Sequence, residues 1–228
     1  MLPGLFCVRG MEAYLHGAVS DEQVPRLKSL LEGLSAGPGE HVEELHVVMA
    51  AAPTEEGGVP SEVLLCRDAH AGAPTGGPAA WRVRLASRPL AGERASKLGA
   101  AVRDVSHGVA TSGDAFKLHA SAGYKIQYQL MRTGLRFALL EPCGRVVVVS
   151  LLRLSVRDPN ALPKGVGLLE ATCATSADDY SAACAALDAV RVRLAPCGQL
   201  VKPATHLVRP GEAAALVAPT KPVLGLRT

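Results

Sequence analysis

Aromatic side chains are scarce in this chain of 228 residues, since phenylalanine, tryptophan and tyrosine together make up 4% of it. A core has to be built mainly from valine, leucine and alanine, and the 48% hydrophobic content excludes wholesale disorder. No apolar run approaches the length of a membrane-spanning helix; Val146–Val149, with Leu151–Leu152 after one serine, is one of the longer apolar stretches. The apolar stretch Leu2–Val8 lacks a charged leading segment and a cleavage-like end, so we expect no signal peptide.

Recognisable active-site motifs are also absent. The six cysteines have no CxxC or other ligand spacing, which indicates reduced, buried thiols in a cytosolic or nuclear protein. Gly165-Val166-Gly167 lacks the rest of a dinucleotide fingerprint, and no Walker A loop, GxSxG elbow or HExxH motif occurs. The seven histidines are dispersed. We therefore predict no catalytic residue, no metal and no cofactor, and expect a protein that works by binding other proteins.

Charge is distributed unevenly along the chain. The net charge of +3 is carried by the segment after Val201, and the body before it is neutral. Within the body, ten acids and three bases precede Arg67, whereas twelve bases and four acids lie between Arg82 and Arg153. The acidic early strands could lie beside basic middle strands and neutralise them. Alternatively, the basic half could form a face for an acidic partner or a phosphate chain. We favour the first interpretation.

Hydrophobic spacing predicts seven to eight short strands with a helix near each end. The first helix covers Val24–Leu34 after a capping-box arrangement of Ser20 and Gln23, and the last runs from Asp178 to about Leu194. A further short helix follows Asp114. Expected strands are Glu12–Val19, His41–Ala52, Glu62–Arg67, Trp81–Arg88, Tyr124–Leu130, Leu135–Leu139, Arg145–Val156 and Val166–Thr175, with Ala100–Ala110 open between strand and helix.

Two details of this pattern are specific enough to test. Trp81, Val83 and Leu85 alternate with Arg82 and Arg84, so the two sets should point to opposite sides of a sheet. Thr133 and Gly134 interrupt an alternating run and predict a hairpin turn there.

Mostly short connections favour antiparallel pairing, because parallel strands need crossover helices that are not present. The predicted fold class is α+β, an antiparallel β-barrel of about eight strands with flanking helices. We divide the chain into an N-terminal extension (1–10), the barrel domain (11–202) and a proline-containing tail without periodicity, expected to be disordered (203–228).

Antiparallel barrels with basic interiors include the tunnel triphosphatases, which hold a divalent metal with several carboxylates on one strand face. In this chain Glu12 is followed at alternate positions by Tyr14 and His16, and Glu43 and Glu44 fall on opposite faces. Basic residues that could line such a tunnel are Arg82, Arg84, Lys125 and Arg136. A metal-dependent triphosphatase acting on nucleotide or RNA 5′ triphosphates is thus the alternative function. Three or more acids converging inside the barrel, or a sheet that does not close, would overturn the interpretation as a non-enzymatic scaffold.

Several segments, taken in order, resemble the subunit 18 family of Mediator, the coactivator complex of RNA polymerase II. They are MEAYLHGAVSDEQVPRLKSLLEGL, WRVRLASRP, AAVRDVSHGVATSGDAFKLHASAGYKIQYQLMRTGLRF and LLEATCAT, together with the last helix, and they lie between Met11 and Lys202. The resemblance implies a non-enzymatic nuclear subunit with a barrel related to the triphosphatase tunnel. It also implies pairing with Mediator subunit 20, attachment to the head module by a helix of Mediator subunit 8, and only indirect contact with RNA polymerase II.

The resemblance implies no membrane association and no direct sequence-specific DNA binding. A nucleic-acid-binding module is less favoured, because Tyr124 and Tyr128 lie opposite Lys125 rather than on its face. Candidate partner-binding residues are Trp81, Val146, Val148 and Leu151, since aromatic and apolar anchors dominate interfaces. The alternative, that all four belong to the internal core, stays open at this point.

Overall fold

The computed structural model describes residues 5–35, 37–51, 62–68, 80–87, 89–110, 115–156 and 166–203. In chain order the elements are β1 (Leu5–Ser20), α1 (Val24–Leu34), β2 (Glu40–Ala51), β3 (Glu62–Asp68), β4 (Trp81–Ala86), α2 (Glu93–Ser96), β5 (Ala101–Ala110), α3 (Ala115–Ser121), β6 (Tyr124–Leu140), β7 (Val146–Val156), β8 (Val166–Thr175), α4 (Tyr180–Leu194) and β9 (Gln199–Val201). None of the helices in these ranges is long and apolar enough to cross a bilayer.

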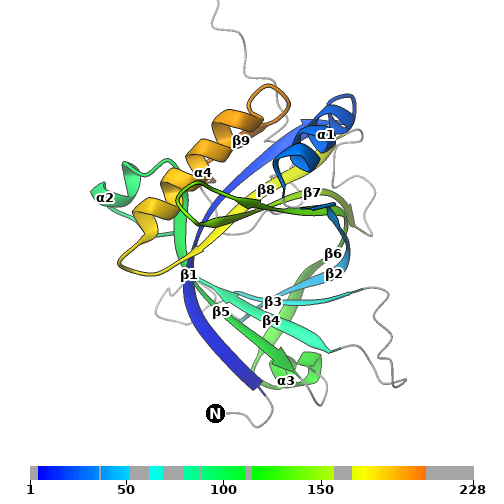
Figure 1. The fold of residues 1–228 in the computed structure, drawn as a ribbon. Helices are drawn as coiled ribbons and strands as arrows, with labels where there is room; N and C mark the ends of the chain where they lie inside the picture. Colours follow the sequence, from blue (N-terminus) through cyan, green and yellow to red (C-terminus); the bar gives the residue numbers. More distant parts are fainter. Residues whose placement is uncertain are drawn as a thin grey trace, which may run out of the picture.

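Eight antiparallel strands close into a barrel in the order β5-β4-β3-β2-β6-β7-β8-β1, and pairing of β1 with β5 completes the circle. Figure 1 looks into this barrel, with α1 and α4 on one side of the wall and α3 on the opposite side. The predicted fold class is confirmed. Strand β1 is long enough to pair with β5 through its first half, with β8 through its second half, and with β9 at His16–Ala18.

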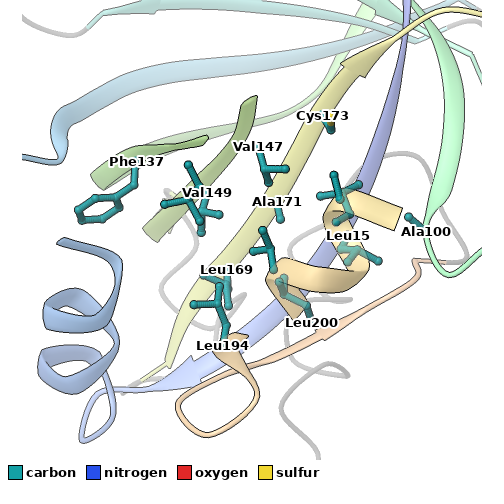
Figure 2. Packing of buried hydrophobic residues seen from close by; sticks show 14 of the residues in the cluster. Leu15, Ala100, Phe137, Val147, Val149, Leu169, Ala171, Cys173, Leu194 and Leu200 are labelled. Carbon is teal, nitrogen blue, oxygen red and sulfur yellow. The ribbon is translucent and has the colours of Figure 1, made fainter. Parts of the chain in front are cut away.

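The larger apolar core lies outside the barrel wall, under helices α1 and α4. Figure 2 shows outward side chains of β1, β6, β7 and β8, such as Leu15, Phe137 and Leu169, facing these helices. Helix α4 buries one face in this cluster: Cys184, Leu187, Val190 and Leu194 are buried, and Tyr180 packs against them. Burial of one such large apolar side chain contributes about 1.5–3 kcal/mol, so the helices stabilise this side of the wall.

A second apolar cluster covers the outer faces of β2, β3 and β4. The alternation predicted for β4 is confirmed: Trp81 and Val83 belong to this cluster, whereas Arg82 and Arg84 point into the barrel. The Trp81 ring meets the Phe116 ring of α3 edge-on, with the centroids 4.6 Å apart. Helix α3 therefore holds the lower wall as α1 and α4 hold the upper one.

The predicted hairpin turn at Thr133 and Gly134 is wrong. Strand β6 runs without interruption from Tyr124 to Leu140 and pairs with β2 on one side and β7 on the other. Gly134 is required for another reason: a Cβ atom there would lie 2.1 Å from the backbone oxygen of Leu151. The glycine permits a close approach of β6 and β7 inside a strand, a known alternative to a turn.

Other predicted element boundaries also differ from those in the structure. The expected capping box is wrong, because Gln23 is the N-cap of α1 and no side chain caps the helix. Ala101–Ala110 is a strand, β5, and residues 5–10 of the expected N-terminal extension pair with it as part of β1. The short elements α2 and β9 were not predicted. Asp114, the loop 158–165 and residues 204–228 of the expected disordered tail lie outside the described residues.

Candidate functional site

Charged side chains line the barrel interior, which makes it the candidate site. Alternate residues of a strand face the same side, so Glu12, Tyr14 and His16 of β1 all face inward. The register places Glu12 opposite Arg103 of β5 and His16 opposite Glu170 of β8. On the other side of the barrel, Glu44 of β2 lies opposite Arg132 of β6. Three inward carboxylates are thus built into the wall next to basic residues.

The first ion-pair group is centred on Glu12. Arg103 Nε donates to Glu12 Oε1 at 2.7 Å, and Arg84 Nη2 donates to the same oxygen. Arg103 is 3% exposed, and its guanidinium carbon lies 4.0 Å from the centre of the Tyr14 ring. One carboxylate therefore neutralises part of the charge of two arginines on neighbouring strands β4 and β5.

The second group is centred on Glu44. Its carboxylate accepts hydrogen bonds from Arg82 at 2.8 Å and from Arg136 at 3.1 Å, and lies 2.9 Å from His46 Nε2. Burial disfavours the ionised form of Glu44, but the hydrogen bond with His46 and the charge of Arg136 outweigh it and hold the pKa of Glu44 well below its usual range. Glu44 is therefore ionised at neutral pH and holds β2, β4 and β6 together.

The third group is centred on Glu170. Arg132 Nη2 donates to Glu170 Oε2, and His16 Nε2 lies 3.9 Å from Glu170 Oε1. Burial raises the pKa of Glu170, but the charges of Arg132 and His16 lower it to about 2. Burial lowers the pKa of both lumen histidines, His16 and His46, to about 4, even though the neighbouring glutamates act in the opposite direction. Both imidazoles are neutral at pH 7.

These contacts confirm that the acidic early strands lie beside basic middle strands. Glu12 binds Arg84 and Arg103, and Glu44 binds Arg82 and Arg136. Three carboxylates do lie inside the barrel, but each is engaged by its own arginines. Within the described residues, no three His, Cys, Asp or Glu side chains are grouped so that they could hold a metal ion. Of the basic residues proposed to line a tunnel, Arg82, Arg84 and Arg136 join these groups, and Lys125 is exposed at the start of β6.

The lumen groups predict a loss of stability in acid. In the unfolded chain a histidine takes up a proton near pH 6.5, whereas His16 and His46 take it up only near pH 4 in the folded barrel. The unfolded state therefore binds more protons between these values, and each histidine costs roughly 2 kcal/mol of stability at pH 5. Below pH 4.5, Glu170 and Glu44 add to this loss, because the unfolded chain protonates these carboxylates while the folded barrel keeps them ionised. We expect the urea midpoint to fall steadily from pH 7 to pH 4.

A matched pair of variants on β2 tests the origin of this loss. His46→Gln should make the decline between pH 6.5 and pH 4 shallower, because one titrating group is removed. His41→Gln should leave the slope unchanged, since His41 is exposed on the same strand. Equal slopes in all three proteins would contradict the assignment.

The residues predicted to bind partners fall into two sets. Trp81 is 9% exposed and Leu151 is 7% exposed, and both pack in the chain's own apolar clusters. Val146 is 49% exposed and Val148 is partly buried, and both face inward at the end of β7. Leu140 of β6, which pairs with Val146, is 66% exposed. Leu140, Glu170 and Arg132 were not predicted as site residues; the alternation along β6 and β8 separates the two faces of each strand, but not which face points into the barrel.

The comparisons with known proteins agree with the predicted resemblance, although no family model matches the chain. The chain is 26% identical over 205 residues to subunit 18 of the Mediator of RNA polymerase II transcription from Arabidopsis thaliana, which covers 85% of this chain and 87% of that protein. The resemblance to the subunit 18 family is confirmed. This similarity supports a role as a Mediator subunit.

Solved structures give the same fold. A chain of the Schizosaccharomyces pombe Mediator head module matches with a TM-score of 0.61 and 15% identity, over 85% of this chain and 98% of that chain. The PH1819 protein of Pyrococcus horikoshii matches with a TM-score of 0.52 and 14% identity, over 84% and 94% of the two chains. A putative adenylyl cyclase from Hippeastrum with a dominant triphosphatase activity matches with a TM-score of 0.50 and 10% identity, over 90% and 95%.

Proposed function

We propose that this chain is a non-enzymatic structural subunit of Mediator in the nucleus, which pairs with the barrel of subunit 20 and is held to the head module by a helix of subunit 8. The similarity to a Mediator subunit 18 along most of both chains is the observation that carries this proposal. The barrel shared with a chain of the Mediator head module supports it. Contact with RNA polymerase II is then indirect, through the rest of the complex.

The interior of the barrel fits a scaffold better than an active site. Each of the three lumen carboxylates described above is bound by at least one arginine. A tunnel triphosphatase needs free carboxylates to hold its metal. The ion-pair groups instead tie each strand to the next one or two strands around the wall and hold the cross-section of the barrel, so that its rim keeps a fixed shape for a partner.

The exposed apolar pair of Leu140 and Val146 is the surface that we assign to a partner. The two side chains are neighbours across β6 and β7, and Val148 lies beside them on the same face. Apolar anchors next to a rigid wall are typical of binding hot spots, within an interface that buries about 800 Å² per partner. Trp81 and Leu151 are not part of this surface, because both are buried in the chain's own apolar clusters.

Co-expression of the chain with Mediator subunits 20 and 8 should yield one stoichiometric complex in size-exclusion chromatography. A Val146→Asp variant should leave the fold intact, since this side chain is half exposed, but should weaken the complex at least tenfold. The reason is that a charged group buried at an interface loses its hydration without gaining a partner, and this lowers the affinity. Ile126→Asp is the matched control, because Ile126 is 47% exposed and lies at the other end of β6 from Leu140.

Separate elution of well-folded chains would contradict the proposed function. An unchanged complex with Val146→Asp would contradict only the assigned surface. Release of phosphate from a nucleoside triphosphate with Mg²⁺ or Mn²⁺, abolished by Arg84→Ala, would instead support the triphosphatase alternative.

A further inference from the structure

A small cavity lies inside the barrel between the ion-pair groups. Its volume is about 50 Å³, and one water molecule needs about 10–15 Å³ on the same measure, so it has room for a group of three to five non-hydrogen atoms. One part of the lining is basic and the rest is largely apolar. The polar side of the lining holds Arg84, Arg103, Arg132, His16, His46, Tyr128 and one carboxylate, Glu170, and the apolar side holds Val48, Leu64, Leu130, Leu154 and Leu168.

Two arginine donors in this lining have no acceptor in the protein. The Nε–H groups of Arg84 and Arg132 are buried, and no hydrogen-bond partner for them exists among the described residues. The Nη2 atoms of the same arginines are already used, by Glu12 and Glu170 respectively. Buried donors without an acceptor are costly. A ligand that offers acceptor oxygens would satisfy both.

The charge around the cavity also favours an anion. The lining carries three arginines (Arg84, Arg103 and Arg132) and Glu170, and Glu12 binds two of these arginines, which leaves one positive charge. Both histidines are neutral at pH 7, so they add donors or acceptors rather than charge.

The placement of the arginines determines which anion fits. Arg84 lies on β4 and Arg132 on β6, and two strands, β3 and β2, separate them around the wall. The two Nε–H donors therefore reach the cavity from different sides. A tetrahedral oxyanion has acceptor oxygens pointing in several directions and can meet both donors. Guanidinium groups match phosphate oxygens in geometry as well as charge. The small volume limits the ligand to one such group.

We propose that the barrel cavity binds a single phosphate group, either as the free ion or as the end of a phosphate ester, between Arg84 and Arg132. Each arginine keeps its glutamate and donates its remaining Nε–H to a phosphate oxygen. No bond is made or broken, and no metal takes part. This site is separate from the Leu140 and Val146 surface, so the two proposals can fail independently.

Titration calorimetry of the full chain with inorganic phosphate tests the proposal. We expect saturable binding with one site per chain and a dissociation constant of about 1 mM or below, a range that corresponds to a few strong polar contacts. Arg84→Lys keeps the charge that Glu12 needs but lacks the Nε–H donor, and should weaken binding about tenfold. Arg132→Lys gives the same test from the other side. Circular dichroism checks that each variant is folded.

Arg153→Lys serves as the control, because Arg153 is 59% exposed and binds Asp21 at the surface. It should bind phosphate as the parent chain does. A second titration with glycerol phosphate identifies the source of the group: tighter binding than inorganic phosphate assigns an ester, and weaker binding assigns the free ion. Absence of saturable heat, or equal affinities in the parent and both lumen variants, would overturn the proposal.

Discussion

Replacing Glu12 by alanine is expected to destabilise the barrel by about 3–5 kcal/mol, the cost of leaving buried charges without their partner. Glu12 is 8% exposed, and its carboxylate binds both Arg84 and Arg103. Without it, the guanidinium groups of two adjacent strands repel each other in a region that solvent barely reaches. Because whole domains have only about 5–15 kcal/mol of stability, this variant should lose a large part of it. Urea denaturation at pH 7 followed by circular dichroism measures the difference.

Glu93→Ala is the matched control for this experiment. Glu93 also binds a basic residue, Lys97, but the two side chains are 84% and 71% exposed. Surface pairs of this type contribute about 0.2–1 kcal/mol, so the urea midpoint should hardly move. If Glu12→Ala lost less stability against urea than Glu93→Ala, the lumen ion pairs would not be holding the wall together.

A Gly17→Ala substitution should displace β9 and cost about 3 kcal/mol, the upper range for overpacking a well-filled site. A Cβ atom at Gly17 would lie 1.8 Å from the backbone oxygen of Gln199 and 3.2 Å from the Cα atom of Leu200. Backbone atoms cannot rotate away as side chains do, so β9 has to leave β1. Leu200, which is 2% exposed in the main core, would become accessible to water. Faster hydrogen exchange at residues 199–201, together with a lower urea midpoint, is the expected result.

The same strand supplies the control, because Gly10 also belongs to β1. A Cβ atom at Gly10 meets no heavy atom within 4 Å, and this glycine does not adopt a positive φ angle. Gly10→Ala should be neutral or stabilising by about 0.4–1 kcal/mol, since alanine restricts the unfolded chain. Unchanged exchange at residues 199–201 in Gly17→Ala would contradict the close approach of β9.

Period-two alternation was the most reliable signal in the sequence. It predicted the inward and outward faces of β4, and it placed Glu12, Tyr14 and His16 on one face of β1, as the structure has them. The excess of acids early in the chain and of bases in the middle predicted which strands neutralise each other. These inferences held because a closed barrel keeps the alternation along every strand, and because buried charges require partners of opposite sign.

The failures share a physical cause: they depend on which strands are neighbours, and a single sequence does not contain that information. Gly134 suggested a turn because glycine is common in turns, but in the structure its missing side chain lets β7 lie close to β6. Ser20 and Gln23 matched a capping box, but β1 continues through Ser20. Glu170 could be recognised as a lumen residue only after β8 was known to lie between β1 and β7, and β9 was too short to show a period of its own.

The triple pairing of β1 affects how the chain reaches its native state. Met11 pairs with Thr175, so the first strand to emerge from the ribosome has to wait for nearly the whole domain before its second edge is covered. Contacts this distant along the chain slow folding, and an uncovered edge can add a strand from another molecule. During synthesis the second edge of β1 therefore stays uncovered until β8 has been made, with β5 as its earlier partner.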